Sequence, residues 1–122
     1  MERSLVSVVD DDESVRESLP DLLAQLGFAV KAFSSAEEFL ASDSVGQTRC
    51  LIVDVVMPGM TGIELQRELI LRRRRIPIVF ITAHRDETIR PHLLDAGAAE
   101  ILFKPFSEMA LREALNAALE LR

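Results

Sequence analysis

Five short, mostly apolar runs alternate along the chain with segments in which apolar residues recur at helical spacing. The runs are Leu5–Val9, Phe28–Phe33, Leu51–Val53, Ile78–Ile81 and Ile101–Phe103. Apolar runs bounded by turn residues suit strands buried on both faces, whereas the alternating second run suits a partly exposed strand. Strands that alternate with helices imply a parallel sheet with helices on both faces, and right-handed crossovers favour the order 2-1-3-4-5. The sequence therefore predicts a doubly wound α/β domain.

The segments between the runs carry start and stop signals for helices. A helix is predicted from Glu13 to Leu26, with Asp12 as its cap and Gly27 as its stop. Pro20 predicts a bend near Ser18 or a late start for this helix. Further caps are predicted at Ser35 with Glu38, Thr61 with Glu64, and Ser107.

Two other segments are less regular. Ser42–Thr48 is polar and predicts a loop. Arg85–Ala96 has helical character, but Pro91 lies in its middle, so this helix is expected to be short, kinked or late to start.

Composition limits the class of protein. A chain of 122 residues suits one domain with one core, and it contains one cysteine, Cys50, which is expected to be a buried, inert thiol. We find no secretion signal and no apolar stretch long enough to cross a membrane, so a soluble, cytoplasmic protein is expected. The net charge of -6 makes the chain a poor binder of polyanions. Arg72–Arg75 is the exception, interpreted mainly as a solvated cationic helix end, with nucleic-acid contact as the alternative.

Polar side chains stand at the ends of four predicted strands. Asp10 and Asp11 follow the first strand, Asp54 the third, Thr82 the fourth and Lys104 the fifth. Because the carboxyl ends of parallel strands share one edge, and ligands bind where the winding reverses, we expect these groups to converge. Carboxylates about 4 Å apart repel by roughly 4 kcal/mol per pair at an effective dielectric of about 20, so a cation is needed.

A magnesium site is the predicted answer, with Mn²⁺ or Ca²⁺ as substitutes. Asp11 and Asp54 are the expected direct ligands, Asp10 a direct or water-bridged one, and the Val56 backbone carbonyl a further one. The second oxygen of Asp54 is then free to attack phosphorus. Lys104, the Thr82 hydroxyl and the backbone N–H groups of Val55 and Ala83 are the predicted holders of the phosphoryl oxygens.

Four motifs resemble the receiver domain of bacterial two-component response regulators, especially nitrogen-fixation-type regulators with a helix-turn-helix output domain. They are VVDDDESVR, LIVDVVMPGMTG, VFITAH and FKPF, at residues 8–16, 51–62, 79–84 and 103–106. The resemblance covers residues 1–122 and implies a flavodoxin-like (βα)5 fold. It implies Asp54 as phosphoacceptor, Asp10 and Asp11 as the metal pair, Thr82 as the switch hydroxyl, and Lys104 as the phosphate-binding lysine before a cis proline.

One position departs from that family pattern. The family often has Tyr or Phe three residues before the lysine, where this chain has Ile101. A ring-flip readout is therefore excluded, and we expect Thr82 to act through packing on the helix predicted at Arg85–Ala96.

The resemblance implies a switch that takes a phosphoryl group from a sensor histidine kinase and controls transcription. It is expected to catalyse only its own phosphorylation and dephosphorylation and not to act as a metabolic enzyme. DNA binding is expected only through an output domain outside residues 1–122, and the fifth strand with the last two helices is the expected surface for phosphorylation-dependent pairing. The alternatives are a stand-alone receiver acting through protein contacts, a Mg²⁺-dependent phosphohydrolase, and a flavodoxin-type carrier. Val56 occupies the position where such hydrolases commonly carry a second Asp, and acids stand where the carrier needs a phosphate-binding loop.

Overall fold

The computed structural model describes residues 3–83, 88–95 and 97–120. Its strands form one parallel five-stranded sheet in the order β2-β1-β3-β4-β5. The strands are β1 (Leu5–Val9), β2 (Ala29–Phe33), β3 (Thr48–Asp54), β4 (Ile78–Thr82) and β5 (Glu100–Phe103), and the helices are α1 (Glu13–Gln25), α2 (Ala36–Leu40), η1 (Asp43–Gly46), α3 (Gly62–Leu71), α4 (Ile89–Asp95) and α5 (Glu108–Glu120). The predicted fold class and strand order are confirmed.

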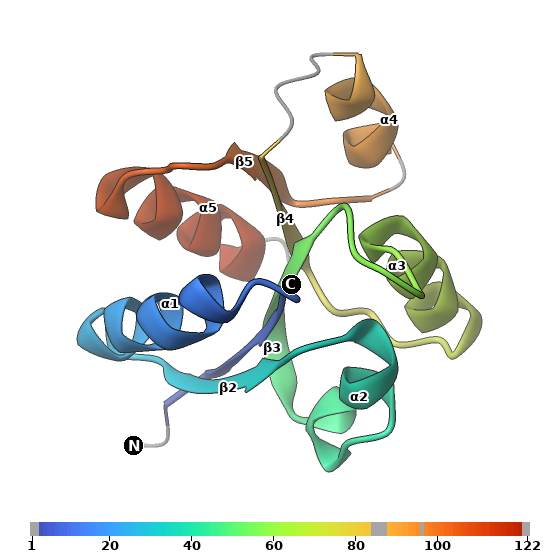
Figure 1. Cartoon of the computed structure of the whole chain (residues 1–122), viewed down its shortest axis with the longest axis horizontal. Coiled ribbons are helices and arrows are strands. Elements are labelled where there is room, and N and C mark those ends of the chain that lie inside the picture. The colour runs from blue at the N-terminus through green and yellow to red at the C-terminus, as the bar shows by residue number, and fades with distance from the viewer. Residues whose placement is uncertain (1–2, 84–87, 96, 121–122) are drawn as a thin grey trace.

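Helices cover both faces of the sheet (Figure 1). α1 and α5 lie on one face, where Leu23 and Leu115 pack against strand residues such as Ile52. α2, α3 and α4 lie on the other face, where Phe39 and Leu69 pack on the side of the sheet that Val53 faces. Neighbouring residues of β3 thus enter opposite halves of the core, which is why its sequence is apolar without alternation.

The predicted helix caps are present. The Asp12 carboxylate accepts a hydrogen bond from the Ser14 N–H at 2.9 Å, and the Ser107 hydroxyl accepts one from the Ala110 N–H at 3.0 Å. Both halves of the Thr61–Glu64 capping box are formed. The predicted Ser35–Glu38 capping box is only half formed. Ser35 caps α2, but the Glu38 carboxylate accepts from the Ser34 hydroxyl instead of from the Ser35 N–H.

The structure corrects two predictions about irregular segments. α1 begins at Glu13 and contains Pro20, so a late start is wrong; burial of Leu19 and Leu23 against the sheet helps to offset the hydrogen bond that the proline removes. The segment predicted as a polar loop contains η1, in which Ser44 and Val45 are buried.

α4 is short, as Pro91 indicates. It begins at Ile89, so Pro91 lies in the first turn, where a backbone N–H has no intrahelical partner. The first residues of the predicted helix, 85–87, and its last, 96, lie outside the described residues.

α3 ends in a tight turn made by the arginine run. The Arg73 N–H donates to the Ile70 carbonyl and the Arg74 N–H donates to the Leu69 carbonyl. Arg73 has a φ of 58°, the left-handed conformation that glycine usually supplies at this position. An arginine there costs about 1 kcal/mol relative to glycine.

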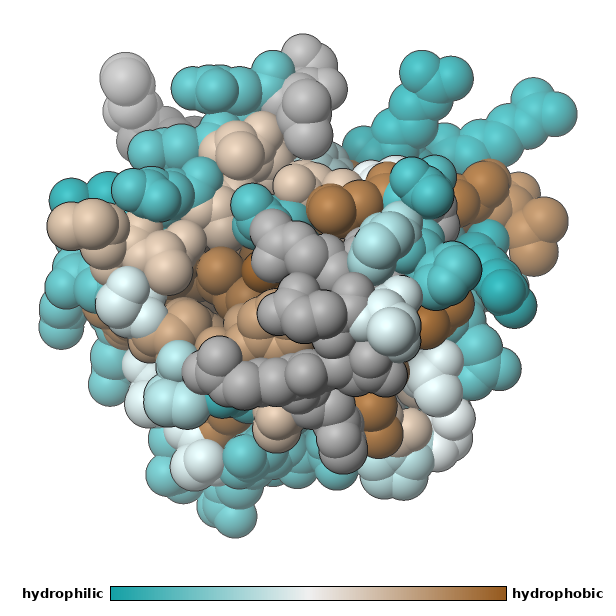
Figure 2. All heavy atoms as spheres, turned by 90° about the horizontal axis from the view of Figure 1, so that it is seen from above, coloured by the Kyte–Doolittle hydropathy of each residue, from teal (hydrophilic) through white to brown (hydrophobic). Residues whose placement is uncertain are grey.

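The buried cysteine and the lengths of the helices agree with what the composition predicts. Cys50 is fully buried, and burial raises the pKa of its thiol to about 12, so the prediction of a buried thiol is confirmed. None of the helices in the described ranges is long and apolar enough to cross a membrane. Seen from above, hydrophilic side chains cover most of the margin, and hydrophobic ones are visible both near the centre and at the right-hand edge (Figure 2).

Candidate functional site

Three carboxylates meet at the carboxyl edge of the sheet. β1 and β3 are neighbours with Val9 opposite Val53, so Asp10, which follows β1, lies beside Asp54, the last residue of β3. Asp11 follows on the exposed side, and one oxygen from each of Asp10, Asp11 and Asp54 lies within 4.8 Å of the others. The convergence expected from the strand ends is present, and three clustered carboxylates suit a hard divalent cation.

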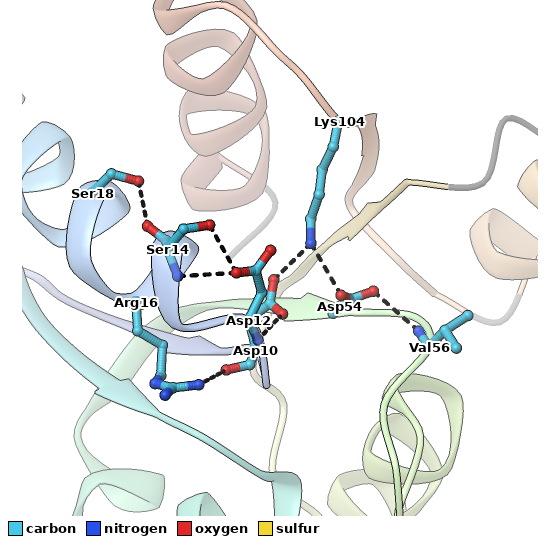
Figure 3. Close-up of polar contacts among 8 residues, drawn as sticks. All are labelled: Asp10, Asp12, Ser14, Arg16, Ser18, Asp54, Val56 and Lys104. Atoms are coloured by element: carbon cyan, nitrogen blue, oxygen red, sulfur yellow. Dashed lines mark hydrogen bonds and ion pairs between the residues drawn. The ribbon is translucent and has the colours of Figure 1, made fainter.

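Lys104 reaches this group from the end of β5 (Figure 3). Its Nζ donates to Asp10 Oδ2 at 2.9 Å and to Asp54 Oδ2 at 3.1 Å. The Lys104 side chain is 18% exposed, while that of Asp10 is fully buried and that of Asp54 is 11% exposed. One ammonium therefore bridges two shielded carboxylates, and the peptide bond that follows it, Lys104–Pro105, is cis as expected.

Burial and charge act in opposite directions in this group. Burial raises the pKa of Asp10, and the hydrogen bonds from the Asp12 N–H and Lys104 offset only part of this effect. Burial also lowers the pKa of Lys104, but the hydrogen bonds and charges of Asp10 and Asp54 outweigh it, so the net shift of that pKa is upward. Lys104 is therefore held as a cation, and further positive charge near Asp10 favours its ionised form.

The three consecutive acids have different positions. Asp10 is buried and its Oδ1 accepts from the Asp12 N–H at 3.0 Å. Asp11 is exposed at the mouth of the group. Asp12 caps α1, and hydrogen bonds from the Ser14 hydroxyl and N–H lower the pKa of its carboxyl. The interpretation of Asp12 as a cap rather than a ligand agrees with these contacts.

β4 brings Thr82 to the same edge. Asp54 is opposite Ile81 in the sheet, and Thr82 is opposite Phe103, so Thr82 lies one position beyond the acid and one before the lysine. The Lys104 N–H donates to the Thr82 carbonyl at 2.8 Å. Ala83 follows and is exposed. The predicted hydroxyl and lysine therefore share a paired stretch of backbone.

The prediction for the Val55 N–H disagrees with the structure. That group donates to the Ile81 carbonyl at 3.0 Å, which extends the pairing of β3 with β4 by one residue. The next N–H, of Val56, donates to Asp54 Oδ1 at 3.1 Å, and Val56 is 54% exposed. Val56 rather than Val55 therefore presents its N–H to the carboxylate.

Residues that sequence reasoning missed also shape the site. Arg16 Nη1 donates to the Asp10 carbonyl at 3.0 Å, and Glu37 Oε2 accepts from the Met60 N–H at 3.2 Å in the loop after β3. Gly62 lies so close to Asp54 that a Cβ there would stand 2.5 Å from the Asp54 carbonyl oxygen. Arg16 lies inside the first motif and Gly62 ends the second, so both had a usable signal, whereas nothing local singled out Glu37.

Residues 6–116 match the family model described as the response regulator receiver domain. The chain belongs to this family. Receiver domains bind Mg²⁺ at an acidic pocket, and in this receiver Asp10, Asp11 and Asp54 form such a group.

Several known proteins resemble nearly the whole chain. Nodulation protein W of Bradyrhizobium diazoefficiens is 42% identical over 97% of this chain and 52% of its own length, and the transcriptional regulatory protein FixJ of Rhizobium meliloti is 41% identical over 94% and 56%. The crystal structure of FixJ-N is 40% identical, covers 98% of this receiver and 96% of its own chain, and has a TM-score of 0.86. The structure of the response regulator StyR is 49% identical, covers 98% of this receiver and 60% of its own chain, and has a TM-score of 0.89. The receiver thus spans about half the length of these curated relatives.

Proposed function

We propose that this receiver is a phosphorylation switch in which Asp54 accepts a phosphoryl group from a sensor histidine kinase. The observation that carries the proposal is the convergence of Asp10, Asp11 and Asp54 with Lys104, which bonds two of these carboxylates. This arrangement offers a nucleophilic oxygen, a metal donor set and a fixed cation within one shielded group, which is what phosphoryl transfer to a carboxylate needs.

In the proposed reaction, an Asp54 carboxylate oxygen attacks phosphorus while the bond from phosphorus to the imidazole nitrogen of phosphohistidine breaks. The imidazole leaves with the electron pair, and the new bond is an acyl phosphate. Mg²⁺, or Mn²⁺ or Ca²⁺ in its place, supplies positive charge when held by Asp10, Asp11, Asp54 and the Val56 carbonyl. Lys104 then exchanges its contact with Asp54 for a phosphoryl oxygen.

The remaining phosphoryl contacts come from this edge of the sheet. We assign them to the Thr82 hydroxyl and the N–H groups of Ala83 and Val56. Val56 replaces Val55 in this role, because the Val55 N–H is bonded within the sheet while the Val56 N–H already donates to Asp54. A donor that faces the carboxylate needs little rearrangement when charge moves onto the phosphoryl group.

The proposed output is a conformation that controls transcription. This is supported by relatives named as transcriptional regulatory proteins. A DNA-binding output domain and phosphorylation-dependent pairing through α4, β5 and α5 remain part of the proposal. A receiver acting alone through protein contacts is the alternative output. A phosphohydrolase is disfavoured, since the exposed Val56 offers no acid or base two residues after Asp54.

The switch is proposed to run from Thr82 through Ile101 to α4. Ile101 is buried and belongs to the same packed cluster as Leu93 of α4. Movement of Thr82 toward a phosphoryl group would therefore change the packing beneath α4 without a ring flip. We expect beryllium fluoride with Mg²⁺ to shift the amide resonances of residues 89–95 and 100–103 more than those of α2. Unchanged resonances in α4 would reject this route.

The decisive test is phosphoryl incorporation from acetyl phosphate, followed by intact mass, with and without Mg²⁺. The parent chain is expected to gain one phosphoryl group only with Mg²⁺, and Asp54→Asn to gain none, because an amide cannot form the acyl phosphate. Asp21→Asn, which removes an exposed acid of α1, is the matched control and should behave as the parent. Magnesium-dependent incorporation in Asp54→Asn would contradict the proposal.

A further inference from the structure

The amino-terminal edge of the sheet, opposite the acidic group, carries a concentration of arginines. Arg3 precedes β1, Arg49 lies near the start of β3, and Arg73, Arg74 and Arg75 precede β4. Among the described residues, the ion pairs of arginines join Arg72 to Glu68 and Arg112 to Glu108, and none involves these five. This edge is therefore a cationic surface on a chain whose net charge is -6.

Two hollows open on this edge. The larger, of about 890 Å³, lies between the end of α3 and the starts of β4 and β5, and its walls combine Arg73, Arg74 and Arg75 with apolar Leu69, Ile76 and Ile78. The smaller, of about 540 Å³, is lined by Arg3, Ser4, Leu5, Gln47 and Arg49. In the described part of the chain, no acidic residue lines either hollow.

Arg74 extends from the larger hollow toward the smaller one. It lines the larger one, and a Cβ added to Gly46 would stand 3.7 Å from Arg74 Nη1. Gly46 directly precedes Gln47 of the smaller hollow. Arginines thus follow the edge from one hollow to the other, and we call these two hollows and their arginines the arginine groove.

Apolar side chains are exposed beside the arginines. Ile70, which lines the larger hollow, is 60% exposed, and its neighbour Leu71 is 78% exposed. Arg73 is also held in a left-handed conformation that would suit glycine better. A cation is thus placed at the mouth of the hollow at a cost in stability, and strain of this kind points to a role outside folding.

We infer that the arginine groove binds an acidic segment of a partner protein that also carries apolar side chains. Carboxylates of the segment pair with Arg73, Arg74 and Arg75, whose guanidinium groups bind carboxylates in a bidentate manner. Its apolar side chains enter the larger hollow against Leu69, Ile76 and Ile78. This interaction does not depend on phosphorylation, and it assigns a role to the arginine run that the switch leaves unused.

Other occupants fit these observations less well. Single-stranded nucleic acid binds by stacking on aromatic side chains, and neither hollow has one among its lining residues. A long polyanion is also repelled by the net charge of the chain. A flat lipid surface cannot fill a hollow of about 890 Å³. A short acidic chain with apolar side chains uses both the charge and the hollow.

The test is fluorescence anisotropy with a fluorescein-labelled peptide of about twelve residues made of glutamate and leucine. We expect the full chain to bind it with a Kd on the order of 10 μM. Arg73→Gln/Arg74→Gln/Arg75→Gln should weaken binding at least about tenfold, while Lys31→Gln/Arg67→Gln/Arg112→Gln, with the same charge, should weaken it less than about threefold. Ile70→Ser should weaken binding without changing charge.

Three further measurements keep the inference open to refutation. Arg73→Gly should weaken binding although its melting temperature is at or above that of the parent, so loss of fold cannot explain the result. Phosphoryl incorporation at Asp54 should be unchanged in every groove variant, which separates this inference from the switch. Equal binding by the arginine variant and its charge-matched control would overturn the inference. The same peptide with serine in place of leucine, an oligothymidine and anionic vesicles should each bind more weakly than the glutamate–leucine peptide. Equal or tighter binding of any of them would also overturn the inference, because the edge would then bind polyanions or lipid.

Discussion

Replacement of Gly62 by alanine is expected to lower the free energy of unfolding by about 3 kcal/mol, although alanine is the better helix former. An added Cβ would stand 2.5 Å from the Asp54 carbonyl oxygen and 3.1 Å from the ring of Phe80. Neither neighbour can move easily, because one is backbone at the end of β3 and the other is a fully buried side chain. The Gly62 N–H also donates to the Val55 carbonyl at 3.1 Å, so relief by a shift of α3 would break a hydrogen bond.

Urea unfolding followed by far-ultraviolet circular dichroism measures this effect, since the chain contains no Trp or Tyr. Gly46→Ala is the matched control. Its Cβ would meet only the Arg74 guanidinium, at ordinary distances of 3.7 Å to Nη1 and 3.9 Å to Nη2, so its stability should stay within about 0.5 kcal/mol of the parent. An unchanged urea midpoint for Gly62→Ala would show that the close approach is not a constraint.

The same substitution should affect the site. The backbone that Gly62 contacts is that of Asp54 itself, so a shift there moves the phosphoacceptor relative to Lys104 and Asp10. Phosphoryl incorporation should therefore slow in the folded fraction of Gly62→Ala and remain at the parent rate in Gly46→Ala.

The parts of the site that were predictable depend on strand ends. The run Leu51–Val53 identifies a buried strand, and a parallel sheet then brings Asp10, Asp54 and Lys104 to one edge whatever their separation in sequence. Local signals were also sufficient for the Thr61 cap of α3, which needs only residues three apart.

The parts that were not predictable depend on register and on tertiary contact. Val56 rather than Val55 faces the carboxylate because the Val55 N–H donates to the Ile81 carbonyl of the neighbouring β4. No pattern within one strand encodes that choice. The close approach at Gly62 arises between a helix start and a strand end that fold against each other. Pro20 does not delay the start of α1 for a related reason, because packing of this helix on the sheet overrides local preference.

Lys104→Met is expected to change magnesium affinity and phosphoryl incorporation in opposite directions. Loss of a residue with a purely structural role would lower both. Magnesium affinity should rise by about tenfold, equivalent to about 1.4 kcal/mol, because the variant removes the ammonium that donates hydrogen bonds to Asp10 Oδ2 and Asp54 Oδ2. Phosphoryl incorporation should fall by about a hundredfold or more, because one fixed charge that meets the transferring group is lost.

Calorimetric titration with Mg²⁺ measures the first effect, and the time course of intact mass with acetyl phosphate measures the second. Lys31→Met, which removes an exposed lysine of β2, should leave both unchanged. If affinity and incorporation fell together in Lys104→Met, the lysine would be acting by holding the carboxylates in place. A rise in affinity with a fall in incorporation would instead mean that Lys104 and the metal share the same oxygens, so that the ammonium must leave Asp54 before the phosphoryl group can occupy its place.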